Sequence, residues 1–315
     1  MRIMQIGEYL KNRRRDLNLT QAQVCAGIWE VSTLSRIERG LQTPGYGLLS
    51  TLLERLGMPA ARYYALLSQN ELDVETLMRE IRADEIRFRR APAEDRPRIR
   101  KRAEEKLSRL ERLTEPEDQI TRQYILSARA ALGRKDGPYS FEERLDMLME
   151  AIRLTVPRFD LEKVGHFRYS MAEATLINQI ARTFSQAGKK SQAISIYRQL
   201  LDYIRKNNQK LSRYAGQFCL AAHNCAIDLA SEKYYPEATA LTKKGQKICI
   251  EYGDYQFLPG FLSIQAECCY YTGDREKSAA LYFQAYYTYA AILDKHNCAL
   301  IRQEMKEHLG LEPQY

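Results

Sequence analysis

The chain repeats a pattern of small and large side chains over its C-terminal half, and this repetition constrains the fold more than any other feature. A polar residue followed by a small residue occurs three times: Gln192-Ala193, Glu237-Ala238 and Lys277-Ser278. The small residues of these pairs are 45 and then 40 residues apart. Each pair follows a helix-like segment such as Ile180-Ala181-x-x-Phe184 or Ala226-x-x-Leu229. Periods of this length indicate helical hairpins that stack on one another, so we predict an all-α chain.

The best of these units, with Gly188, Ala193, Tyr197 and Leu200, resembles the tetratricopeptide repeat, in which small residues let two antiparallel helices approach. Its period exceeds the usual ~34 residues, so we expect longer helices or loops. Apolar residues at helical spacing predict further hairpins at 71–113, broken at Ala91-Pro92, and at 120–155, and a final helix near 297–309. We therefore predict about five hairpins in a right-handed superhelix, forming a ligand-binding and dimerisation domain over residues 69–315.

Residues 20–44 predict two short helices joined by a tight turn. Thr20 and Gln23 have the spacing of a capping box, and Val24, Ile28, Leu34 and Ile37 are expected to face inward. Ser32 is a candidate N-cap for the second helix, and Gly40 can end it in the left-handed conformation. Thr43-Pro44 predicts the start of a fourth helix with Leu48, Leu49, Leu52, Leu53 and Leu56 as its apolar stripe, and a short fifth helix follows at about 60–67.

The second of these short helices leaves polar and basic residues off its buried stripe: Ser32, Thr33, Ser35, Arg36 and Arg39. Short hydroxyls permit close approach to a base edge, and arginine can bond guanine or phosphate in a bidentate manner. The spacing of the whole segment favours a DNA-contacting face over an ordinary solvated one.

Residues 6–67 resemble the five-helix Xre/Cro-type helix-turn-helix domain, through Leu19-Thr20-Gln21, the block 32–40 and Thr43-Pro44. The resemblance implies DNA contacts from Gln21, Ser32, Thr33, Ser35 and Arg36, and a structural role for Glu38 in the turn to the fourth helix. We add Arg14, from the basic run of the first helix, together with Arg39 and Thr43, and assign residues 1–68 to this domain. The turn 27–31 departs from the common pattern, because it is about one residue shorter and lacks the usual turn glycine.

Composition limits the remaining possibilities. A net charge of +8 suits a polyanionic partner such as DNA. The seven cysteines are odd in number, contain no Cys-x-x-Cys pair and lie mostly at apolar helical positions, so we expect reduced core residues in the cytoplasm. Charged residues occur too early in the N-terminal segment for a signal peptide. No apolar run approaches the ~20 residues that a membrane-spanning helix requires.

Polar residues also occupy the positions expected to line the concave face of the repeats. They are Asn178, Arg182, His223, Asn224, Glu267, Tyr270 and Tyr271. An asparagine side chain offers a donor and an acceptor to a peptide bond, which suits an extended peptide, although a solvated or interhelical role is equally open for a single asparagine.

A helix-turn-helix domain followed by tetratricopeptide-like repeats resembles the RRNPP class of peptide-pheromone regulators, which includes the Rgg and PlcR relatives. The resemblance implies a homodimer on a palindromic operator, with a short signalling peptide in the repeat groove and a part in quorum sensing. Asn178 and Asn224 are similar in place to the asparagines that hold the peptide backbone in that class.

The sequence shows no arrangement of residues typical of a catalytic site. The four histidines, 166, 223, 296 and 308, lack the spacing of a metal-binding helix, and there is no Gly-rich phosphate loop. We expect neither an enzyme nor a cofactor. The alternative to a peptide receptor is that the repeats dock a partner protein, or serve only as a dimerisation scaffold.

Overall fold

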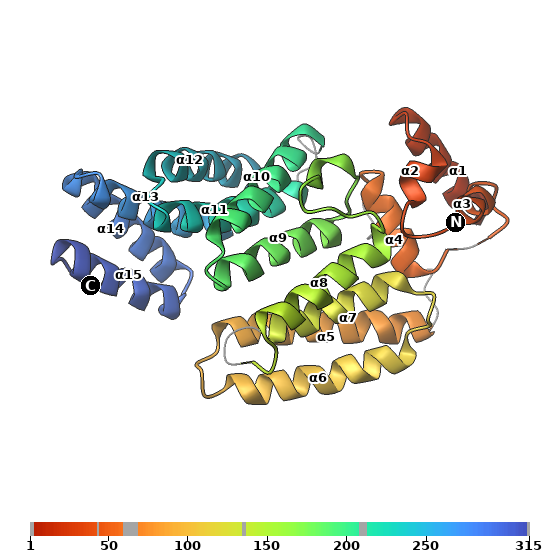
Figure 1. Cartoon of the computed structure of the whole chain (residues 1–315), viewed down its shortest axis with the longest axis horizontal. Helices are drawn as coiled ribbons and strands as arrows, with labels where there is room; N and C mark the ends of the chain where they lie inside the picture. Colours follow the sequence, from red (N-terminus) through yellow and green to blue (C-terminus); the bar gives the residue numbers. More distant parts are fainter. Residues whose placement is uncertain (1–2, 43, 59–68, 134–136, 208–212, 314–315) are drawn as a thin grey trace. The chain divides into compact units, whose positions relative to one another are not determined.

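The computed structural model of the chain describes residues 3–42, 44–58, 69–133, 137–207 and 213–313, and all regular structure in these segments is helical (Figure 1). Internal contacts divide the chain into two compact units, Met1–Ile180 and Ala181–Tyr315, with the division inside helix α9 (Met171–Gln186). The predicted domain boundary between residues 68 and 69 falls within the first unit and stays a prediction.

The first unit opens with four short helices around a single apolar core: α1 (Ile3–Asp16), α2 (Gln21–Cys25), α3 (Val31–Glu38) and α4 (Tyr46–Arg55). The residues expected to face inward do so, and Leu10 and Leu53 have no exposed surface. Leu17, which directly follows α1, has 37% of its surface exposed, because α1 ends at Asp16 and Asn18 turns the chain with a positive φ of 54°.

The start of α2 is as predicted. The hydroxyl of Thr20 accepts a hydrogen bond from the backbone N–H of Gln23, and the Gln23 side chain accepts one from the Thr20 backbone N–H at 2.8 Å. These reciprocal bonds satisfy two donors that a helix N-terminus leaves without partners.

The predicted start of α3 at Ser32 is wrong by two residues. Helix α3 begins at Val31 with Glu30 as its N-cap, and the Glu30 side chain makes no capping bond. The cause lies in the turn, because Gly27 takes a positive φ of 73° two residues after α2 ends at Cys25, and the chain then enters α3 at Val31. Gly40 ends α3 with a φ of 71°, as predicted.

Helix α4 also begins later than predicted. Its N-cap is Gly45, in an extended conformation, so Pro44 precedes the helix and does not open it. The predicted cap Thr43 and the predicted fifth helix at 60–67 lie outside the described residues.

Two helical hairpins follow within the first unit, and each packs on itself: α5 (Gln69–Arg90) with α6 (Arg96–Leu113), and α7 (Gln119–Leu132) with α8 (Phe141–Thr155). The break between α5 and α6 lies at Ala91 and Pro92, as predicted. Ile81, Ala103, Leu107 and Leu110 are fully buried between the helices. Most charged residues of this segment lie at its surface, but Asp84 is buried and pairs with Lys106 at 2.6 Å.

The segment between α8 and α9 was not predicted from the sequence. It contains only a short 3-10 helix, Val164–His166, and it is anchored by Tyr169, whose hydroxyl donates to the carbonyl of Val164 at 2.7 Å. Ser170 and Glu173 then form a capping box at the start of α9. The spacing Ser-x-x-Glu at 170–173 is the signal that could have located this helix start.

Among the described residues, the second unit holds the end of α9, a short 3-10 helix at Tyr255–Phe257 and six further α-helices. They are α10 (Lys190–Asn207), α11 (Arg213–Ser231), α12 (Tyr235–Tyr252), α13 (Leu258–Tyr271), α14 (Arg275–Ala291) and α15 (Lys295–Leu309). Helices α11 and α12 pack as one hairpin, α13 and α14 as the next, and α15 packs on α14. The helix order of the described segments therefore confirms the predicted hairpins and the final helix.

The cysteines are free thiols, and six of the seven are buried. Sγ of Cys219 and Sγ of Cys249 lie 3.6 Å apart between α11 and α12. None of the described helices combines the length and apolar character required to cross a membrane.

Gly245 permits the close approach of α12 and α13. A Cβ at this position would lie 2.6 Å from Cε2 of Phe261, which is fully buried. We expect Gly245→Ala to destabilise the protein by about 1–2 kcal/mol, because overpacking outweighs the gain in helix propensity. The control is Gly47→Ala in α4, where the nearest atoms are Cγ2 and Cβ of Ile120 at 3.8 and 3.9 Å. Urea unfolding should show the control to be neutral or stabilising; equal effects would contradict the packing argument.

Candidate functional site

Helix α3 presents a polar face that the rest of the domain leaves uncovered. Leu34 and Ile37 are buried on one side of the helix. Ser32, Arg36 and Arg39 are exposed on the other side, and Thr33 and Ser35 are partly exposed. The structure therefore brings together five of the residues predicted to contact DNA on a single helix face.

Glu38, at the end of α3, joins the first three helices. Its carboxylate accepts hydrogen bonds from Arg14 of α1 at 2.6 and 2.9 Å and from the side-chain amide of Gln21 of α2 at 2.7 Å. The hydrogen bond to Glu38 raises the pKa of Arg14 above its usual value. The predicted structural role of Glu38 thus lies between α1, α2 and α3, and the carboxylate makes these bonds instead of ordering the turn to α4.

This network affects two predicted DNA contacts. The side chain of Arg14 is only 12% exposed and also donates to the carbonyl of Leu19. Gln21 is partly exposed at the start of α2 and donates to Glu38. Contact between either residue and DNA stays a prediction, and for Arg14 it would require the ion pair with Glu38 to open.

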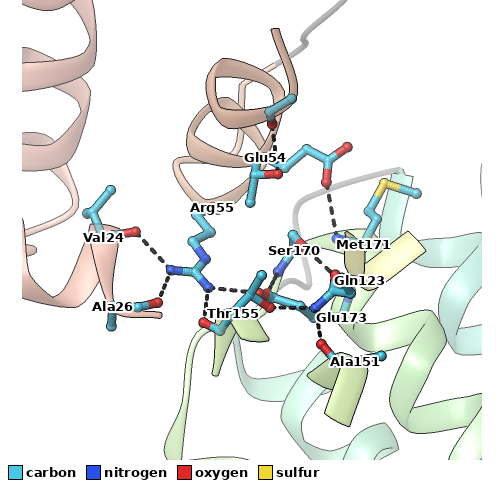
Figure 2. A network of polar contacts seen from close by, with 12 residues as sticks. Val24, Ala26, Glu54, Arg55, Gln123, Ala151, Thr155, Ser170, Met171 and Glu173 are labelled. Carbon is cyan, nitrogen blue, oxygen red and sulfur yellow. Dashed lines mark hydrogen bonds and ion pairs between the residues drawn. The ribbon is translucent and has the colours of Figure 1, made fainter. Parts of the chain in front are cut away.

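A second polar network, which sequence reasoning missed, connects α4 to the hairpins of the first unit (Figure 2). The guanidinium of Arg55 donates to the carbonyls of Val24 and Ala26 at 3.0 and 2.7 Å. It also donates to the carbonyl of Thr155 at 3.3 Å and to the Glu173 carboxylate at 2.7 Å. The side chains of Arg55 and Glu173 are 2% and 1% exposed.

Further bonds hold the acceptors of this network in place. The second carboxylate oxygen of Glu173 accepts from the backbone N–H of Ser170 at 2.6 Å. Gln123 of α7 donates to the hydroxyl of Thr155 and to the carbonyl of Ala151. The ends of α2 and α8 and the start of α9 therefore meet around one buried arginine.

The predicted peptide-binding residues are divided between the two units. Asn178 belongs to the first unit, and its side chain is buried, with 4% exposed surface. Arg182, His223, Asn224, Glu267, Tyr270 and Tyr271 belong to the second unit. Of these six, Tyr271 is the most accessible, with 51% of its surface exposed, and the others are partly exposed.

His223 packs as an apolar ring. Its centroid lies 5.8 Å from Phe257 and 5.9 Å from Phe261, and Gly260 provides the space that the imidazole occupies. Burial lowers the pKa of His223 to about 4, so the ring is neutral near pH 7. This environment gives His223 a packing role, and Asn224 beside it is likewise only partly exposed.

The aromatic residues of α13 contact α15. Tyr270 stacks on His308 with centroids 4.3 Å apart, and Tyr271 meets the same ring edge-on at 5.6 Å. The guanidinium of Arg275 lies 5.7 Å from the ring centre of Tyr270. Tyr271 in addition stacks on Tyr235 at 5.3 Å. Because Tyr271 is exposed and Tyr270 only partly so, Tyr271 is the better placed of the two tyrosines for an apolar ligand group.

Glu267 and Glu304 form an acidic pair on α13 and α15. Burial raises the pKa of Glu304 to about 7, and the charge of Glu267 adds to this effect. Burial also raises the pKa of Glu267. Glu304 and His308 were not among the predicted site residues, because only the packing of α15 brings them to α13.

The comparisons with known proteins agree with this arrangement. Residues 5–65 match the family model described as a helix-turn-helix domain. No curated protein sequence matches the chain significantly. The resemblance predicted from the sequence is confirmed by solved structures of the same architecture, at the level of the fold.

Three solved structures cover almost the whole chain. PlcR from Bacillus thuringiensis, in complex with the peptide PapR7 and DNA, has a TM-score of 0.57 and 16% identity, with 95% of this chain and 99% of that chain covered. ComR from S. thermophilus, in complex with DNA and its signalling peptide ComS, has a TM-score of 0.51 and 16% identity, with 97% and 100% covered. The SHP pheromone receptor Rgg2 from Streptococcus dysgalactiae has a TM-score of 0.51 and 13% identity, with 96% and 100% covered.

The acidic pair predicts a pH-dependent stability. A carboxyl group whose pKa is raised by folding stabilises the native state at low pH, and this contribution is lost as the pH rises through the folded pKa of about 7. We therefore expect Glu304→Gln to raise the thermal midpoint of the full chain at pH 8 and to have little effect near pH 4.5. The control is Glu276→Gln, an exposed carboxylate on α14. An effect of Glu304→Gln that is equal at both pH values would contradict the assignment.

Proposed function

We propose that this protein is a sequence-specific DNA-binding transcription regulator whose repeats bind a short signalling peptide. The observation that carries the proposal is the uncovered polar face of α3 in a domain that matches the helix-turn-helix family. PlcR and ComR, which share the fold, were solved with DNA and peptide bound. An enzymatic activity is not part of the proposal, and we expect the protein to act in the cytoplasm without a cofactor.

In the proposed interface, α3 enters the major groove of DNA. Ser32, Thr33, Ser35 and Arg36 would meet base edges, and Arg39, Gln21 and Thr43 would meet phosphates or flanking positions. Arg14 would meet a phosphate only if its ion pair with Glu38 opens. The charge of +8 favours the approach of a polyanion.

We also propose that the protein acts as a homodimer on a palindromic operator, since a single small domain buries too little surface to select one genomic site. Exposed apolar side chains of the second unit support this proposal: Ile250, Tyr287, Ile292 and Leu293 have 57%, 49%, 57% and 82% of their surface exposed. A dimer would remove part of this surface from water.

The proposed peptide site in the second unit uses the partly exposed polar groups of α9, α11 and α13. Asn224 would bond the peptide backbone, Arg182 a carboxylate, and Tyr271 an apolar side chain. Glu267 would meet a donor of the peptide. Tyr270 and His223 would support these groups through their ring contacts. Asn178 would contribute only if its buried side chain becomes accessible.

Substitution of Arg36 separates DNA recognition from folding. We expect Arg36→Ala to lower operator affinity by about 1–3 kcal/mol without changing the thermal midpoint, because the side chain is exposed. Arg14→Ala is the comparison: it should lower the unfolding free energy by about 2–4 kcal/mol, because it leaves the carboxylate of Glu38 without its cation. Gel shifts over a salt series and urea unfolding measure both effects. Unchanged operator affinity of Arg36→Ala would rule out the α3 face.

A peptide titration tests the second half of the proposal. Candidate peptides are those encoded by small open reading frames beside the gene, and calorimetry with the full chain identifies a binder. We expect Asn224→Ala to weaken this peptide by about 1–3 kcal/mol, because a peptide amide loses its partner. Operator affinity of the peptide-free variant should equal that of the wild type.

The same titration decides between peptide sensing and the alternative of a docking or dimerisation scaffold. Peptide affinity and operator affinity must change by one reciprocal factor if the two sites are coupled. Equal binding of the peptide to wild type and Asn224→Ala would show that the site is misplaced. A peptide affinity that operator DNA leaves unchanged would contradict the switch while leaving the site intact.

A further inference from the structure

The network around Arg55 joins the helix-turn-helix domain to the hairpins of the first unit. We call the group formed by Val24, Ala26, Arg55, Thr155 and Glu173 the Arg55 junction (Figure 2). Two of its acceptors, the carbonyls of Val24 and Ala26, belong to α2 and its end. The other two, on Thr155 and Glu173, belong to α8 and α9, more than 90 residues away along the chain.

The positions of the acceptors restrict the relative orientation of the helices that the Arg55 junction joins. The carbonyls of Ala26 and Thr155 lie at the C-terminal ends of α2 and α8, where a helix leaves acceptors without partners and its dipole favours a cation. A guanidinium offers its donors in a planar, fixed arrangement, so it can satisfy these acceptors and Glu173 only in one relative orientation. The capping box with Ser170 fixes the position of Glu173 in turn.

Backbone packing beside the Arg55 junction also restricts the relative orientation of the joined helices. A Cβ on Gly27 would overlap the carbonyl oxygen of Thr155 and lie 2.5 Å from Cδ of Pro157. The turn between α2 and α3 therefore lies directly against the end of α8. The carboxylate of Glu54 adds a contact to this boundary, since it accepts from the backbone N–H of Met171 at 3.3 Å.

The junction leaves the polar face of α3 uncovered. Ser32, Arg36 and Arg39 are exposed, and none of the bonds of the junction involves α3. The contact therefore holds the DNA-binding domain in one orientation and does not mask its polar face.

We propose that Arg55 is a positioning residue for DNA recognition: by fixing the helix-turn-helix domain to the hairpins of the first unit, it restricts a dimer to one spacing between half-sites. This inference rests on the proposed function, since it requires a dimer that reads two half-sites. A buried ion pair of this kind restricts geometry more than it adds stability, because desolvation of both charges offsets much of their attraction. Without the junction, each recognition helix can adopt several orientations, and operators of different spacing become similar in affinity.

The test compares operators that differ only in spacing. The full chain first selects an operator from random duplex DNA, and one, two or about 5 base pairs are then inserted between its half-sites. We expect the wild type to lose at least about tenfold in affinity on insertion, and Arg55→Met less than about threefold. Affinity for a duplex with a single half-site should be the same for both proteins, which a merely structural loss would not produce.

Two further variants complete the comparison. Glu173→Gln keeps the shape of the side chain and removes its charge, so it should relax the spacing in the same direction as Arg55→Met. Arg87→Met is the control, because Arg87 is exposed on α5 and paired with Asp84 at 2.9 Å outside the junction; it should keep the wild-type profile.

If folded Arg55→Met keeps the wild-type dependence of affinity on spacing, the inference is overturned and the proposed function is unaffected. If Arg55→Met fails to fold, the same result with Glu173→Gln has the same meaning. Failure of both variants to fold, seen by circular dichroism, would also overturn it, because the pair would then serve stability and not orientation. If the wild-type chain selects no symmetric DNA, the proposed function fails first and the inference with it, and this result is known before any variant is compared.

Discussion

The buried ion pair between Arg55 and Glu173 is the interaction on which the arrangement of the first unit depends. Two charges removed from water are unfavourable unless their remaining hydrogen-bonding groups find partners. Here the carbonyls at the ends of α2 and α8 and the N–H of Ser170 supply most of these partners, and Nε of Arg55 is left without one. Because these partners come from elements far apart in the sequence, satisfying the pair also fixes how the small N-terminal domain meets the hairpins.

A second carboxylate plays a comparable part inside the N-terminal domain. Glu38 binds Arg14 and Gln21, so it holds α1 and α2 against the end of α3 while the opposite face of α3 remains exposed. Polar residues in this chain thus divide into buried ones that fix geometry and exposed ones that are available to a ligand. Residue type alone does not separate these groups: Arg14 and Arg36 are both basic residues of the same domain, and only Arg36 is exposed.

Local patterns predicted much of the fold. The capping box at Thr20, the apolar stripes of α3 and α4 and the hairpin break at Pro92 were correct, because each depends on residues within a few positions of one another. The starts of α3 and α4 were misplaced, because Gly27 and Gly45 set the backbone there. The Arg55 junction and the contact of Tyr270 with His308 were missed, since both join residues distant in sequence and appear only when the hairpins pack.

The central claim is that the exposed face of α3 reads DNA. Amide hydrogen exchange of the full chain, measured with and without its selected operator, tests it most directly. The account predicts slower exchange over residues 31–39 on DNA binding, with the arginine-rich helices α5 and α6 unchanged. Protection of α5 and α6 with no change in α3 would contradict it, because DNA would then bind the charged surface of the first hairpin and not the helix-turn-helix domain.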